Sequence, residues 1–276
     1  MRAYGSTNIQ YSRGCPFDCE FCDIIKIFGR KPRTKDDDQF LGEMDALYKA
    51  GWRGSVFFVD DNFIGNRPRV RKMLPKVQKW MEEHNFPFTL YTEASVDIAQ
   101  DDALLEGMVQ AGMRKVFLGI ETPEAESLRE ANKGQNLRGN LLDAVRKIQK
   151  YGMQVMAGFI VGFDHDPEDI FERQIEFIRK SAIPLSMVGI LSALPGTDLY
   201  HRLKKEGRLL EESTGNNTEG HINFRTRMDP QRLREGFHRI TTTIYNSPDY
   251  YQRVLDFLAH YGTRRPESFH PPELVS

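Results

Sequence analysis

The sequence predicts an α/β protein whose parallel sheet is built from six βα units. Short apolar segments rich in Val, Ile and Phe alternate with charged, amphipathic segments, as expected for buried strands covered by helices. At 276 residues the chain can bury one substantial core. Polar and acidic residues recur where the predicted strands end, the edge at which barrel-like α/β proteins build their sites. We therefore expect one main domain with its site at that edge.

Each predicted strand is short and precedes a predicted helix. We expect strands over residues 8–12, 55–60, 88–94, 115–121, 155–162 and 186–192. The matching helices are expected over residues 39–50, 69–84, 103–111, 137–151, 167–181 and 197–205. Asp36 to Asp38 can cap the first helix, and Gly51, Gly112 and Gly152 stand where a helix ends in the left-handed conformation.

The alternation fades in the last third of the chain. A Gly- and Asn-rich stretch over 215–220 precedes two further predicted helices, 230–245 and 248–260. We interpret residues 1–197 as the core domain and 198–262 as an appended helical extension. Residues 263–276 contain three prolines and little apolar material, so we expect a flexible tail there.

Composition excludes some classes of function. The net charge of −1 provides no general attraction for nucleic acid or an anionic membrane. No apolar run reaches membrane-spanning length, and the N-terminus lacks the apolar core of a secretion signal. Three cysteines within eight residues cannot all pair as disulfides, which favours a reducing compartment and a metal role. We therefore expect a cytoplasmic protein that binds no nucleic acid.

The cysteines are the strongest functional signal. Cys15, Cys19 and Cys22 form a C-x3-C-x2-C pattern between the first predicted strand and the first predicted helix. A [4Fe-4S] cluster usually takes four cysteines, so three leave one iron open for a substrate or cosubstrate. A zinc knuckle, or a cluster completed by a fourth residue, is the alternative. The seven histidines are scattered and do not follow at zinc-finger spacing.

Acidic residues end three more predicted strands. Asp60, Asp61 and Asn62 close the second strand, Glu93 closes the third and Glu121 closes the fourth. A carboxylate after a buried apolar run is costly unless it is paired, so these residues are site candidates. Alternatively, Asp60 and Asp61 cap the next segment, and Glu93 and Glu121 form structural ion pairs.

Two further features are less specific. Gly158, Ile160 and Gly162 lie in the fifth predicted strand, where glycine indicates close approach by a ligand or backbone, or merely a small core residue. The basic segment from Arg30 to Lys35 either balances anionic groups near the cysteines or is a solvated surface.

Together these motifs resemble the radical S-adenosylmethionine (SAM) superfamily, in which an aromatic residue, here Phe21, precedes the last cysteine. Segments 9–17, 58–62, 92–95, 158–163 and 193–197 are similar to the cobalamin-binding branch, especially hopanoid C-2 methylases. The resemblance implies a partial (β/α)6 TIM-like barrel with a C-terminal helical extension. It also implies an iron–sulfur enzyme of methyltransferase lineage.

The resemblance further implies a cofactor site and a chemistry. Cys15, Cys19 and Cys22 would hold a [4Fe-4S] cluster whose open iron binds the amino and carboxylate groups of SAM. Reductive cleavage of SAM gives methionine and a 5′-deoxyadenosyl radical that abstracts hydrogen from a small or lipid-like substrate. An electron donor such as flavodoxin or ferredoxin is implied. The residues expected to contact SAM are Phe21, Asp60, Asp61, Asn62, Glu93, Glu121, Gly158, Ile160 and Gly162.

Cobalamin is the open question. In the similar methylases a cobalamin domain precedes the barrel, whereas the first predicted strand here begins at residue 8. No histidine lies two positions after an aspartate, so the Asp-x-His-x-x-Gly ligand motif is missing. We expect that the chain is part of a longer protein, that a separate protein supplies cobalamin, or that cobalamin is not used.

Three other functions stay open. A related radical SAM enzyme could catalyse a rearrangement or cyclisation without methyl transfer. An iron–sulfur module could transfer electrons without SAM turnover. A zinc-stabilised nucleic-acid binder is the third, although the net charge of −1 counts against it.

Overall fold

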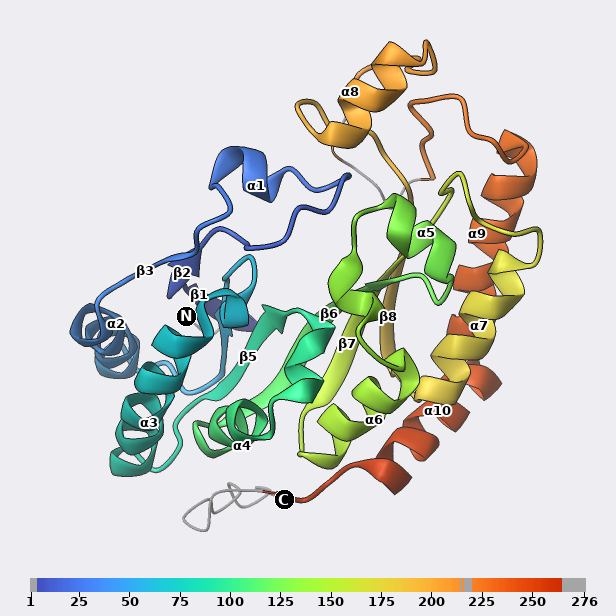
Figure 1. Ribbon diagram of the computed structural model, residues 1–276. Coiled ribbons are helices and arrows are strands. Elements are labelled where there is room, and N and C mark those ends of the chain that lie inside the picture. The colour runs from blue at the N-terminus through green and yellow to red at the C-terminus, as the bar shows by residue number, and fades with distance from the viewer. Residues whose placement is uncertain (1–3, 214, 216–219, 265–276) are drawn as a thin grey trace.

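Six parallel strands form one sheet in the computed structural model, which describes residues 4–213, 215 and 220–264. Their order is β1 (Ser6–Ile9), β4 (Ser55–Phe58), β5 (Thr89–Ala94), β6 (Met113–Glu121), β7 (Gln154–Val161) and β8 (Leu185–Ile190). All neighbouring pairs are parallel, so the carboxyl ends of the strands share one edge (Figure 1). The predicted α/β class is confirmed.

Helices cover the outer side of the sheet and continue into a C-terminal pair (Figure 1). The helices are α1 (Ile24–Ile27), α2 (Asp37–Lys49), α3 (Arg67–Glu83), α4 (Asp102–Gln110), α5 (Ala125–Glu130), α6 (Leu141–Lys150), α7 (Ile170–Ser181), α8 (Asp198–Lys205), α9 (Pro230–Tyr245) and α10 (Ser247–His260). Helix α9 packs against α7 and β8, and α10 packs against α9 and α6. The predicted C-terminal helices are thus present.

The predicted helix boundaries have the expected local causes. The Asp36 carboxylate accepts a hydrogen bond from the Asp38 amide (2.9 Å) at the start of α2. Gly51, Gly112 and Gly152 follow α2, α4 and α6 with positive φ. The helix predicted over 137–151 begins later, at Leu141, because the Asn140 side chain caps it there.

The first predicted strand differs from the observed one. Strand β1 ends at Ile9, and the chain then forms a small antiparallel sheet of two short strands, β2 (Ser12–Arg13) and β3 (Arg33–Thr34), which flank the cysteine loop and α1. The reason is Asp60, whose carboxylate accepts hydrogen bonds from the amides of Tyr11 and Ser12, both at 2.8 Å. These amides therefore turn away from a neighbouring strand and toward a side chain.

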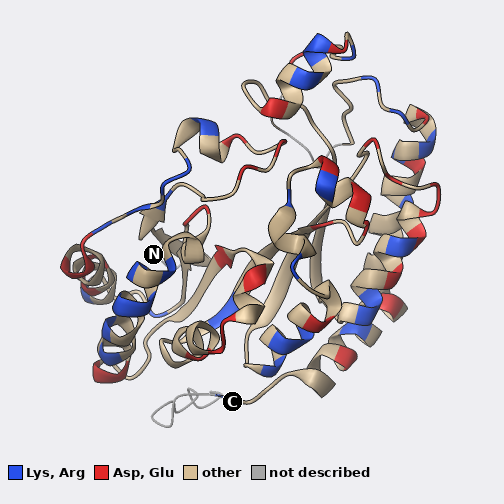
Figure 2. Ribbon diagram, in the orientation of Figure 1, with Lys and Arg blue, Asp and Glu red and all other residues tan. Residues whose placement is uncertain are grey.

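The core lies between the sheet and its helices, and a smaller apolar cluster lies at the carboxyl edge. Phe163, Leu199, Leu203 and Phe224 belong to the smaller cluster, against which Phe21 packs. Charged residues of both signs lie mainly on the helices and loops (Figure 2). Within the described residues, no helix combines the length and apolar composition needed to cross a membrane. The predicted tail from residue 265 onward lies outside the described residues.

Candidate functional site

The three cysteines line one pocket at the carboxyl edge of the sheet. They follow the β2 strand on a loop that neighbouring backbone groups hold in place. The Cys15 amide donates to the Gly29 carbonyl (3.3 Å), and the Cys22 amide donates to the Cys19 carbonyl (3.1 Å). The Gly14 amide donates to the Asp61 carboxylate (2.6 Å), which ties the loop to the end of β4. The three closely spaced cysteines therefore line the same pocket.

The thiols are free and have polar neighbours of the kind that suit a metal-bound sulfur. The Asn62 amide group lies 3.7 Å from Cys15 Sγ, and the Gln135 amide group lies 3.5 Å from Cys19 Sγ, both as donors. Burial raises the pKa of the Cys15 thiol, and it raises that of Cys22 to about 11. Cys15 and Cys22 therefore hold their protons until a metal displaces them.

Two carboxyl groups face the thiols from neighbouring strands. Asp61 and Glu93 both line the pocket, and the Glu93 carboxyl group lies at the end of β5. Burial, together with the negative charge of Asp61, raises the pKa of Glu93 to about 7. A cation in the pocket would favour the ionised form of Glu93. Asp61 and Glu93 therefore suit this side of the pocket to a positively charged ligand.

Glu121 and Lys133 form a buried ion pair in the same pocket. The Lys133 ammonium contacts the Glu121 carboxylate directly, and their side chains are 12% and 8% exposed, respectively. Burial disfavours the charged lysine, but Glu121 and Cys19 outweigh it and raise its pKa above the ordinary value. Glu121 has φ of 62°, a conformation that costs energy in a residue other than glycine. Glu121 therefore forms an ion pair, as the structural alternative expected. Its partner Lys133 also lines the pocket.

The structure brings together most of the predicted site residues. The pocket lining includes Phe21, Asp61, Asn62, Glu93 and Glu121 together with the three cysteines. The Asn62 side chain also bonds Ser95 Oγ at 3.3 Å, so it joins the cysteine loop to the end of β5. Residues from four segments that are distant in sequence therefore meet at one place.

Four predicted residues do not line this pocket: Asp60, Gly158, Ile160 and Gly162. Asp60 is 1% exposed and accepts hydrogen bonds from the Tyr11 and Ser12 amides and from Ser12 Oγ, so it holds a segment much earlier in the chain and does not cap the next one. Gly158 lies behind Phe117, which does line the pocket: a Cβ at Gly158 would lie 3.2 Å from that ring. Ile160 packs in the small apolar cluster, and the Gly162 amide bonds Asp166 at 2.7 Å.

The predicted basic segment contacts the cysteine loop through Arg30 and helix α2 through Lys35. Lys35 bonds Glu43 at 2.6 Å, and Arg30 bonds the Pro16 carbonyl at 3.1 Å and lies 3.3 Å from Asp18. Neither basic residue belongs to the pocket lining.

Sequence reasoning missed Ser95, Phe117, Gly119, Lys133 and Gln135, which also line the pocket. The period of two along β6 could have indicated Phe117 and Gly119, because alternate residues of one strand share a face with Glu121. Lys133 and Gln135 follow α5, at the start of and within a four-residue 3-10 helix (Gly134–Leu137) that is too short to show a periodic signal in the sequence.

Together these features define an α/β barrel protein with a pocket lined by three thiols and several acidic side chains at the carboxyl edge of its sheet. A family model described as the radical SAM superfamily matches residues 9–178, and the chain belongs to that superfamily. A second model, described as a domain of unknown function (DUF4070), matches residues 197–275. The predicted family is confirmed.

Two relatives carry methyltransferase names. An uncharacterized methyltransferase of Synechocystis sp. is 54% identical over 216 residues, covering 78% of this chain and 40% of that protein. The hopanoid C-2 methylase of Rhodopseudomonas palustris is 42% identical over 217 residues, covering 79% of this chain and 41% of that protein. The predicted similarity to hopanoid C-2 methylases is therefore confirmed. The chain spans about 40% of the length of these relatives.

Solved structures share the fold. The radical SAM methyltransferase TsrM of Kitasatospora setae, with cobalamin and a [4Fe-4S] cluster bound, superposes with a TM-score of 0.67 at 15% identity. The match covers 95% of this chain and 53% of that one. The cobalamin-dependent SAM radical enzyme OxsB, with aqua-cobalamin and SAM bound, has a TM-score of 0.64 at 16% identity, over 92% and 45% of the two chains. The predicted partial TIM-like barrel is confirmed.

The donor set is of the kind that an iron–sulfur cluster takes, because cluster irons are held by cysteine thiolates. A four-iron cluster binds each thiolate to a different iron and so accepts thiols that line a wider space. Cys15, Cys19 and Cys22 offer three thiols around such a space, with amide donors on two of the sulfurs. The residues present therefore fit the cluster that the family implies.

Proposed function

We propose that this chain is the catalytic core of a radical SAM methyltransferase-type enzyme that acts on an apolar or lipid-like substrate. The observation that carries the proposal is the joint pocket of three cysteine thiols and acidic side chains at the carboxyl edge of the barrel. When bound there, the cluster and SAM together supply a carbon radical that abstracts hydrogen from the substrate.

The charges of the pocket support the binding of SAM beside the thiols. Asp61, Glu93 and Glu121 contribute three carboxyl groups to the lining and Lys133 one ammonium group. SAM carries a sulfonium, an amine and a carboxylate, so it has one net positive charge. We assign the acidic groups to its cationic parts and Lys133 to its carboxylate. Phe21 and Phe117 supply apolar walls.

An apolar strip next to the pocket supports a lipid-like substrate. Glu93, Phe117, Met156 and Leu185 are aligned in register across β5 to β8, so they share one face of the sheet. Met187, on the same face of β8, and Leu185 are 59% and 42% exposed. Exposed apolar side chains beside a cofactor pocket favour an apolar ligand over a charged one.

Reductive cleavage of SAM tests the proposal. We expect the anaerobically reconstituted, dithionite-reduced chain to release 5′-deoxyadenosine and methionine from SAM, measured by liquid chromatography. The Cys22→Ala variant, which lacks one thiol of the ligand set, is expected to release none. A wild-type chain that holds a cluster but leaves SAM intact would contradict the proposal and favour an electron-transfer module.

The same incubation separates methyl transfer from the rearrangement or cyclisation alternative. With SAM labelled in its methyl group and a hopanoid lipid as the probe, we expect the label to reach the organic phase. Label that stays confined to methionine contradicts methyl transfer.

Repeating the incubation with added cobalamin tests whether methyl transfer by this chain requires cobalamin supplied by a separate protein or domain. A flavodoxin or ferredoxin would replace dithionite as the electron donor, consistent with a cytoplasmic location.

A further inference from the structure

The segment between the second and third cysteines is fastened to two distant parts of the chain. The Glu20 amide donates a hydrogen bond to the Ala131 carbonyl, and the Glu20 carbonyl accepts one from the Leu199 amide, both at 2.9 Å. Ala131 ends α5, and Leu199 lies in α8. Both backbone polar groups of Glu20 therefore bond to helices that are not its neighbours in sequence.

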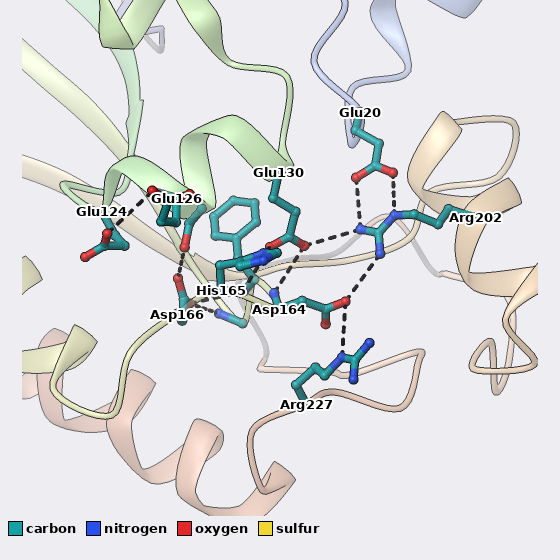
Figure 3. Close-up of polar contacts among 12 residues, drawn as sticks. Glu20, Glu124, Glu126, Glu130, Asp164, His165, Asp166, Arg202 and Arg227 are labelled. Atoms are coloured by element: carbon teal, nitrogen blue, oxygen red, sulfur yellow. Dashed lines mark hydrogen bonds and ion pairs between the residues drawn. The ribbon is translucent and has the colours of Figure 1, made fainter.

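The Arg202 side chain on α8 adds an ionic contact to the same residue. Arg202 Nε donates to Glu20 Oε1 at 2.5 Å, and Arg202 Nη2 donates to Glu20 Oε2 at 2.9 Å. Figure 3 shows the two parallel contacts, with Glu20 above and Arg202 to its right. A bidentate pair of this kind fixes the orientation of the carboxylate as well as its charge.

Arg202 also contacts two other carboxylates, and the carboxylate side chains around it are largely buried. Its guanidinium lies 3.3 Å from Glu130 and 3.3 Å from Asp164. The side chains of Glu20, Glu130 and Asp164 are only 12%, 8% and 11% exposed. Loss of Arg202 would leave Glu20 and Glu130 without this cation, which is costly for buried carboxylates.

Arg208 provides an internal comparison within the same network. It bonds Asp164 Oδ2 at 2.6 Å and Glu206 at 2.9 Å, and its side chain is 14% exposed. Its described contacts do not include Glu20. A change at Arg208 therefore disturbs a buried ion pair of the network without releasing the cysteine loop.

We propose that Arg202 is a positioning residue for the iron–sulfur cluster. Through Glu20 it fixes the chain between Cys19 and Cys22, and it neutralises a carboxylate that lies next to the ligand thiols in sequence. Because α8 lies within residues 197–275, this gives the segment of unknown function a role in building the cluster site. The inference rests on cluster binding in the proposed function.

Hydrogen exchange of the cluster-free chain is the first test. We expect the Arg202→Met variant to exchange the Glu20 and Leu199 amides roughly tenfold faster than wild type, because the ionic contact no longer stabilises these hydrogen bonds. The Arg208→Met variant is the matched control and is expected to retain wild-type exchange at these two amides. This readout needs neither cluster nor substrate.

The cluster itself provides the second test. In Arg202→Met we expect roughly tenfold faster cluster loss to a chelator. We also expect a more negative reduction potential, because the Glu20 charge is no longer balanced. Arg202→Lys keeps the charge but not the bidentate geometry, so it should retain the potential and still lose the cluster faster. Arg208→Met should match wild type in both measurements.

The outcomes separate this inference from the proposed function. If the wild-type chain takes up no cluster, the proposed function fails and this inference fails with it. If the wild-type chain holds a cluster and Arg202→Met matches it in amide exchange, cluster loss and potential, this inference alone is overturned. Equal effects of Arg202→Met and Arg208→Met would likewise overturn it, since they would indicate a general loss of stability.

Discussion

At the scale of one residue, Glu93 shows how a carboxyl group placed in this pocket costs stability. Its carboxyl group is buried beside Asp61, and its pKa rises from the ordinary value of 4.5 to about 7. The folded chain therefore binds this proton more tightly than the unfolded chain does. The stability that the protonated form provides is complete below pH 4.5 and is lost as the pH rises toward 7.

We expect Glu93→Gln to remove this pH dependence. In the absence of ligand, we compare the free energy of unfolding of the variant with that of wild type at pH 5 and at pH 8. The difference in favour of the variant should be about 2 kcal/mol larger at pH 8. Urea unfolding at the two pH values measures the effect. Glu83→Gln, at a residue 57% exposed on α3, is the matched control and should show no such change. A gain that is equal at both pH values would refute the assigned pKa.

At the scale of an element, the end of strand β4 fixes where the cysteine loop starts. Asp60, at the end of β4, accepts three hydrogen bonds from Tyr11 and Ser12 and so directs the chain out of β1 toward the cysteines. Its neighbour Asp61 bonds Gly14 but also lines the pocket. Adjacent carboxylates thus have separate tasks, because alternate residues of an extended chain point to opposite sides.

We expect substitutions of these two neighbours to have different effects. Asp60→Ala leaves two buried amides and a hydroxyl without their acceptor, and should lower the free energy of unfolding by about 3 kcal/mol. Asp61→Asn should change stability much less and weaken SAM binding by the reconstituted chain. Urea unfolding and isothermal titration with SAM measure the two effects. The assignment fails if Asp60→Ala is as stable as wild type.

At the scale of the whole molecule, regular patterns predicted the sheet well. The apolar runs located five strands of the sheet closely, since buried parallel strands have a continuous apolar signature, whereas the strand predicted over 8–12 shares only residues 8 and 9 with β1. The two-residue strands β2 and β3 and the short helices α1 and α5 were missed. Such elements are too short to show a period.

The site was predictable only in part for the same reason. The cysteines and the acids at strand ends could be found because topology places all strand ends on one edge. Lys133 pairs with Glu121 across an irregular connection, and Arg202 reaches Glu20 from 182 residues away. Contacts of this kind depend on the packed helices, and no spacing in the sequence encodes them.

The central claim is that three thiols leave one iron of the cluster open to SAM. The electron paramagnetic resonance spectrum of the reduced cluster, recorded with and without SAM, tests it most directly. We predict that SAM shifts the g values, because its amino and carboxylate groups bind that iron. The Asp61→Asn and Glu93→Gln variants should need more SAM for the same shift. A spectrum that does not respond to saturating SAM would contradict the claim.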